Sequence, residues 1–62
     1  MMPLAHVRDL ETAKAFVAER EVITHVDLHM MQLMLSDEDG RALKAFIAER
    51  GVRIEGDERD AI

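Results

Sequence analysis

The sequence predicts an all-α fold, a small bundle of three helices followed by a short extended segment. Two observations lead to this prediction. Apolar residues recur at spacings of three and four in three successive stretches, and a Ser, Thr or Asp stands where each stretch begins. The predicted helices cover about residues 10–20, 25–35 and 37–50. We expect one domain over residues 1–62, with frayed termini at 1–3 and 57–62.

A third observation is a repeat: "KAFVAER" at residues 14–20 returns as "KAFIAER" at residues 44–50. The two copies lie 30 positions apart (44 − 14), and Val22 matches Val52 at the same distance. An internal duplication explains this, but so does chance, since Ala, Lys, Glu and Arg all favour helices. In either case both copies predict the same structure, and we expect each to pack against the helix between them.

The first predicted helix begins near Asp9, a candidate N-cap. Leu10, Ala13 and Val17 share one face of it. Pro3 suits the start of a longer helix, but the apolar positions before residue 9 drift around such a helix. We therefore expect a break near Asp9.

The middle helix is unusually apolar. Thr24 and Asp27 have the spacing of a capping box at its start. At about 100° per residue, its apolar side chains cover roughly 220° of the surface, more than one exposed helix needs. These side chains are Val26, Leu28, Met30, Met31, Leu33, Met34 and Leu35. Either the flanking helices or a second chain must cover this arc.

We predict that a partner covers part of it, because a chain of 62 residues has a marginal core of its own. The partner is a second copy, giving a homodimer, or a larger protein. Leu28 and Leu33 are expected inside the protomer. The predicted interface residues are Met30, Met31, Met34 and Leu35.

Capping signals also bound the third helix. Ser36 precedes it with Asp39 three residues later, and Gly51 follows it as the usual terminating residue. Beyond Gly51, Val52 and Ile54 alternate with charged residues, which predicts a short strand. Such a strand must pair elsewhere, and Val22 with Ile23 is one candidate.

Composition argues for a soluble, cytoplasmic protein. The net charge is −5, which disfavours direct nucleic-acid binding, and there is no cysteine for disulfides or thiolate metal sites. The start of the sequence does not resemble a secretory signal, and no apolar run reaches the length of a membrane span.

The sequence contains no recognisable catalytic or cofactor motif. His25 and His29 are one helical turn apart, a spacing that suits a metal, but Val26 stands where a zinc protease would carry its general-base Glu. We expect these histidines to form a solvated stripe opposite the apolar arc, with no metal and no cofactor. Ser36, the only serine, is predicted to be a cap. We therefore do not expect an enzyme.

Two families share short patterns with this chain. "VIT" before a short helix, then Leu28, Leu43, Ile47, "GVRI" and an acidic end resemble the N-terminal region (region 1.1) of primary bacterial sigma factors. That resemblance implies an acidic helical module that keeps DNA from a binding surface, although the first connection here is shorter. Separately, "LKAFIAERGVRIEG" resembles half of a SAP-type DNA-binding motif, with Asp57 where Lys usually follows the loop glycine.

The sequence therefore leaves three hypotheses. The first is a small acidic, non-catalytic interaction module, working as a homodimer or as an accessory subunit of a larger protein. The second is an acidic inhibitor that competes with nucleic acid for a basic groove on transcription or defence machinery. The third is a helix-turn-helix or SAP-like DNA-binding module.

Overall fold

The computed structural model describes residues 1–56, so the predictions for residues 57–62 lie outside the described part. Three helices form the body of the fold, and their bounds agree with the predicted ones to within two residues. The elements in chain order are η1 (Leu4–His6, a 3-10 turn), α1 (Leu10–Ala18), β1 (Val22–Thr24), α2 (His25–Met34), α3 (Asp37–Arg50) and β2 (Arg53–Glu55).

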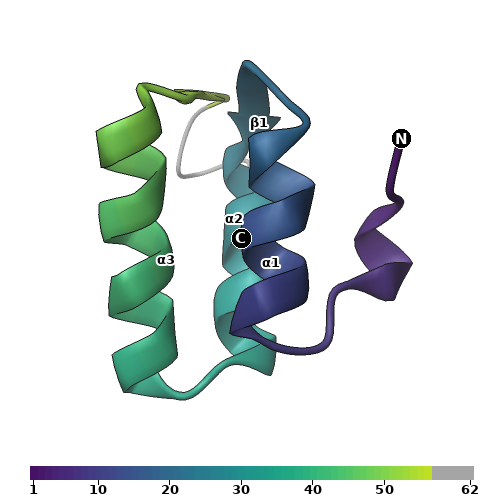
Figure 1. The fold of residues 1–62 in the computed structure, drawn as a ribbon, viewed down its shortest axis with the longest axis vertical. Coiled ribbons are helices and arrows are strands. Elements are labelled where there is room, and N and C mark those ends of the chain that lie inside the picture. Colours follow the sequence, from purple (N-terminus) through teal and green to yellow (C-terminus); the bar gives the residue numbers. More distant parts are fainter. Residues whose placement is uncertain (57–62) are drawn as a thin grey trace.

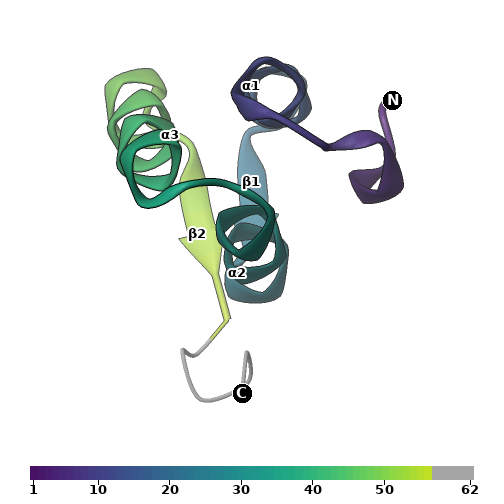
Figure 2. The same ribbon diagram turned by 90° about the horizontal axis from the view of Figure 1, so that it is seen from below.

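The chain rises through α1, descends through α2 and rises again through α3 (Figure 1). Seen end-on, the three helices stand at the corners of a triangle, with α1 beside α3 and α2 below both (Figure 2). The two helices of the repeat therefore run in the same direction. Each is followed by a short strand at the same end of the bundle.

The strands correct the all-α prediction, because β1 and β2 form a two-stranded parallel sheet. The predicted pairing of the extended C-terminal segment with Val22 and Ile23 is confirmed, and Ile23 lies opposite Ile54. The pairing is parallel because α1 and α3 deliver both strands from the same end of the bundle. The Arg53 amide also donates to the Glu21 carbonyl oxygen at 3.0 Å, which extends the ladder by one bond.

All three predicted N-caps are confirmed. Each cap side chain accepts a hydrogen bond from the backbone amide three residues later and so satisfies one of the free N–H groups of the first turn. The oxygen-to-nitrogen distances are 2.9 Å for Asp9 and Thr12, 3.0 Å for Thr24 and Asp27, and 3.2 Å for Ser36 and Asp39. At the other end of α3, Gly51 adopts the predicted left-handed conformation with φ 69°.

One apolar core lies between the helices and the sheet. Within residues 1–56 it contains only apolar side chains, and no polar or charged side chain is buried. α2 contributes Leu28 and Met31 to this core, and α3 contributes Leu43 and Ile47. The remaining core residues are Val7, Ala13, Phe16, Val17 and Ile23.

The N-terminal segment is fastened to α1 by Arg20. Its guanidinium lies 3.5 Å from the centre of the Phe16 ring, and it donates to the carbonyl oxygens of Phe16 (2.7 Å) and Met2 (2.8 Å). The Met2 amide in turn donates to the Glu19 carboxylate at 2.7 Å. The predicted break before α1 is confirmed, because the 3-10 turn ends at His6 and helix α1 starts after Asp9. Fraying of residues 1–3 stays a prediction.

Replacing Gly40 with Ala should stabilise the fold by about 0.5–1 kcal/mol, because glycine is the poorest helix former after proline. Gly40 lies inside α3, and a Cβ built on it meets no atom within 4 Å. Urea unfolding followed by far-UV circular dichroism measures the change. A matched Gly51→Ala substitution should destabilise instead, because its φ of 69° is strained for any side chain.

The cap at Asp9 predicts a dependence of stability on acid pH. A hydrogen bond from the Thr12 backbone amide, followed by one from the Thr12 hydroxyl, lowers the pKa of the Asp9 carboxyl. The folded state therefore holds the charged form more tightly than the unfolded chain does. This contribution is complete above the unfolded pKa and is lost as the pH falls through the lowered folded pKa. Asp9→Asn keeps a capping oxygen without a titrating group, so its unfolding free energy should fall less between pH 5 and 2.

Candidate interaction surface

Helix α2 has two apolar faces, and the core uses only one of them. Leu28 and Met31 are buried, and Leu35, which follows the helix, is half-buried against the core. The core is filled by α1, α3 and the sheet from one side of α2 only. The opposite side of the helix therefore has no cover within residues 1–56.

This uncovered side carries four apolar side chains, which we call the α2 stripe: Val26, Met30, Leu33 and Met34. Their exposed fractions are 45%, 44%, 68% and 45%. Steps of four, three and one along the helix place them in one row about 100° wide. An exposed apolar row of this kind is a candidate surface for contact with another molecule.

The predicted interface residues divide between the two faces. Met30 and Met34 belong to the α2 stripe, and their role in an interface stays a prediction. Met31 is completely buried and Leu35 packs on the core, so both support the protomer's own interior. The expectation that Leu33 lies inside is wrong, since it is the most exposed member of the α2 stripe.

Val26 is, besides Leu33, a stripe residue that the predicted interface omits. Its signal was present in the sequence, because Val26, Met30 and Leu33 follow the four-then-three spacing of a helix contact row. This row is hard to recognise in the sequence because it lies within the wider apolar arc of the helix. An arc of roughly 220° contains two separate faces, and periodicity alone does not say which face the core takes.

The two histidines lie on the flank of the α2 stripe. His29 is exposed, as predicted, and lies three residues after Val26 and four before Leu33, so it borders one edge of the α2 stripe. His25 is half-buried one turn earlier. Within residues 1–56, no three His, Cys, Asp or Glu side chains come together in a way that could hold a metal ion.

The acidic residues within residues 21–40, the segment that contains the α2 stripe, are not matched by any Lys or Arg of the same segment. Residues 21–40 contain no Lys or Arg, so every cation of the described chain lies before or after this stretch. Asp27 is half-buried on the edge of the row, three residues before Met30. Asp37 and Glu38 are exposed at the start of α3, just after Met34. Among the described residues, none of these three carboxylates is in an ion pair.

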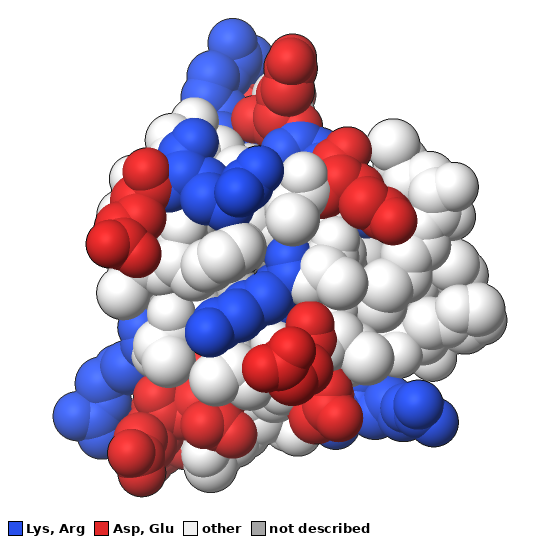
Figure 3. Space-filling view, in the orientation of Figure 1, with Lys and Arg blue, Asp and Glu red and all other residues white. Residues whose placement is uncertain are grey.

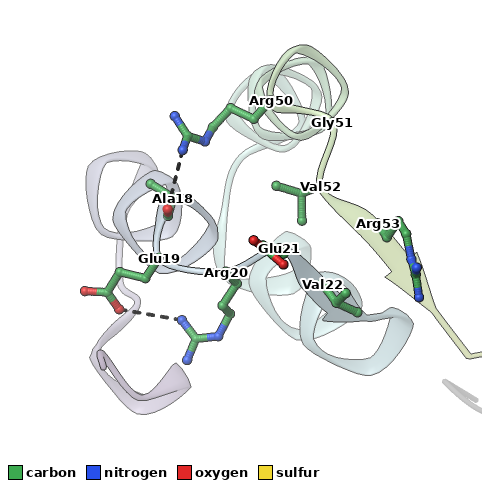
Figure 4. Close-up of a pocket in the computed structure, with 9 residues that line it drawn as sticks. All are labelled: Ala18, Glu19, Arg20, Glu21, Val22, Arg50, Gly51, Val52 and Arg53. Carbon is green, nitrogen blue, oxygen red and sulfur yellow. Dashed lines mark hydrogen bonds and ion pairs between the residues drawn. The ribbon is translucent and has the colours of Figure 1, made fainter.

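The face formed by α1 and α3 differs, because Lys and Arg are interspersed there with Asp and Glu (Figure 3). A depression opens at its upper end, and Arg20, Arg50 and Arg53 are among the residues that line it, with their side chains pointing in different directions (Figure 4). Each of these guanidinium groups already has a partner within the protein. Arg20 donates to the Phe16 carbonyl oxygen, Arg50 donates to the Ala18 carbonyl oxygen at 3.5 Å, and Arg53 forms an ion pair with Glu55. The C-terminal ends of two helices also disfavour an anion there. We attribute these arginines to the fold.

Comparisons with models of protein families, with curated proteins and with solved structures found no match for this chain. The α2 stripe and its acidic surroundings are therefore the observations on which a functional argument rests. None of the helices in residues 1–56 has the length and apolar character that crossing a bilayer requires.

The charge pattern predicts that this protein does not bind duplex DNA at physiological salt. The net charge is −5, and the cations of the α1–α3 face alternate with carboxylates, so this face offers no continuous basic strip to a phosphate backbone. In a gel-shift assay we expect the labelled duplex to migrate unchanged. A shift at submicromolar protein that weakens steeply with salt would support a DNA-binding module instead.

Proposed function

We propose that this chain is a non-catalytic protein–protein interaction module and that the α2 stripe is its binding surface. It acts as an accessory or regulatory subunit, or through self-association. The observation that carries the proposal is the α2 stripe itself, four neighbouring apolar side chains that the chain's own core leaves uncovered.

Two further features support an adaptor over an enzyme. The usual nucleophilic side chains are scarce: there is no cysteine, and the only serine caps α3. Two of the four stripe residues are methionines, whose flexible side chains fit partners of different shapes. A small, firmly capped helix that presents an adaptable apolar row is suited to recognition.

The proposal is tested by capturing partners from the source cell on the immobilised wild type and on two variants. Leu33→Glu places a charge at the centre of the α2 stripe. Ala45→Glu places the same charge at an exposed position of α3 that is away from the α2 stripe. We expect a specific partner to be lost with Leu33→Glu and retained with Ala45→Glu, and both variants to melt as cooperatively as the wild type. A partner that both variants retain would place the binding surface elsewhere.

The acidic surroundings favour a second candidate, an acidic inhibitor that occupies a nucleic-acid groove on another protein. Binding of that kind is driven by charge. Leu33→Glu adds a negative charge, so it should strengthen binding by an acidic competitor and abolish binding through an apolar row. The direction of this one change therefore separates the two functions.

A further inference from the structure

We propose that the α2 stripe binds an amphipathic helix of a different protein, whose apolar face covers the four side chains and whose flanking Lys or Arg residues meet the carboxylates around them. This inference rests on the proposed function and names the chemistry of the partner. It follows from three features of the described residues: the spacing of the row, the sign of the charges beside it, and its size.

The spacing matches a helical partner. Val26, Met30 and Leu33 follow the four-then-three pattern by which two helices interlock their side chains, and Met34 widens the row on one side. The partner's matching row has apolar residues at positions i, i+3, i+4 and i+7. The α2 helix is ten residues long, about 15 Å, so three turns of a partner helix cover it.

The carboxylates beside the α2 stripe favour a partner helix whose flanking residues are basic. Asp27 borders the row along its side, and Asp37 with Glu38 stand beyond its C-terminal end. No Lys or Arg occurs between Arg20 and Arg41. Arg41, one turn after Asp37, donates to the Asp37 carbonyl oxygen at 3.4 Å, and within residues 1–56 it forms no ion pair with a carboxylate. Arg53 of β2 lies opposite Val22 in the sheet, and its guanidinium is paired with the Glu55 carboxylate. A helix with basic flanks is attracted to this surface, and one with acidic flanks is repelled.

A second copy of this chain fits less well. A symmetric pair would bring two copies of the same carboxylate-bordered surface together, in a protein of net charge −5. The four side chains also offer only a few hundred Å² of apolar surface, the order of the largest patch on an ordinary monomer. A stable dimer buries about 800 Å² on each partner. One docked helix needs no more than the α2 stripe provides.

Binding of two designed peptides to the full chain tests the proposal. Both are amphipathic helices of about five turns with the same leucine face; one has Lys and Arg flanks and the other has Glu flanks. Fluorescence anisotropy of the labelled peptides gives the affinities. We expect the basic peptide to bind at least tenfold more tightly than the acidic one, and to weaken as salt rises. Leu33→Glu and Met34→Glu should each weaken it at least tenfold, and Ala45→Glu should not.

Sedimentation of the wild type completes the test, and we expect a monomer at high micromolar concentration. A stable dimer that Leu33→Glu dissociates would overturn the basic-helix proposal in favour of a second copy, while the proposed interaction surface would stand. Equal binding of both peptides would remove the charge argument. If neither peptide binds and no variant changes capture from the cell extract, both the basic-helix proposal and the proposed function fail.

Discussion

Replacing Met31 with Glu is expected to unfold this protein. The Met31 side chain has no exposed surface and is surrounded by apolar residues of the core. A carboxylate there has no buried polar partner, because no polar or charged side chain within residues 1–56 is buried. A domain of this size has only about 3–5 kcal/mol of stability to lose. The far-UV circular dichroism spectrum of Met31→Glu should therefore be that of an unfolded chain at 25 °C.

Met34→Glu is the matched control. It makes the same chemical change three residues later on the same helix, at a position whose side chain is 45% exposed. We expect this variant to remain folded, with a melting temperature within a few degrees of the wild type. A folded Met31→Glu, or an unfolded Met34→Glu, would mean that the two faces of α2 are assigned the wrong way round.

Replacing Phe16 with Ala should cost about 3–5 kcal/mol, which is most or all of the stability of the fold. Phe16 is 2% exposed in the core, and its ring supports the guanidinium of Arg20 at 3.5 Å. Removing the ring leaves a cavity and also deprives Arg20 of the surface that positions it toward the N-terminal segment. Because the sequence has no Trp or Tyr, urea unfolding is best followed by circular dichroism.

Phe46, at the same place in the second copy of the repeat, should be less sensitive. It is half-buried, with the Lys14 amine 5.7 Å and the Arg50 guanidinium 5.6 Å from its ring centre. Phe46→Ala should cost less than the about 1.5–3 kcal/mol that complete burial of such a side chain is worth. Equal losses at the two positions would contradict the unequal burial of the two copies.

The helices and their ends could be predicted from the sequence because their causes are local. Asp9, Thr24 and Ser36 each act on an amide three residues away, and Gly51 acts through its own backbone. The parallel sheet could be predicted only as a possible pairing of two short segments. Its direction depends on how α1 and α3 pack, which is a property of the whole bundle.

The candidate surface could be predicted only in part. The excess of apolar residues on α2 indicates that the helix has more apolar surface than one core needs, and it predicts Met30 and Met34 at an interface. The division of the arc between core and solvent depends on which side α1 and α3 cover. That choice is made by tertiary packing, and it placed Met31 inside and Leu33 outside, the reverse of what the sequence suggested.

The parallel pairing of β1 with β2 also sets the order in which this chain can fold. Val22 and its partner Arg53 are 31 positions apart (53 − 22), and α2 and α3 both lie between them. Closing a loop of that length costs conformational entropy, and two paired strands of three residues are too weakly stable by themselves to offset this cost. We therefore expect the helices to dock before the strands meet, and the sheet to form late in folding. Substitutions in β2 are then expected to speed unfolding and leave the folding rate almost unchanged. This strand would therefore determine how long the native state persists before it unfolds.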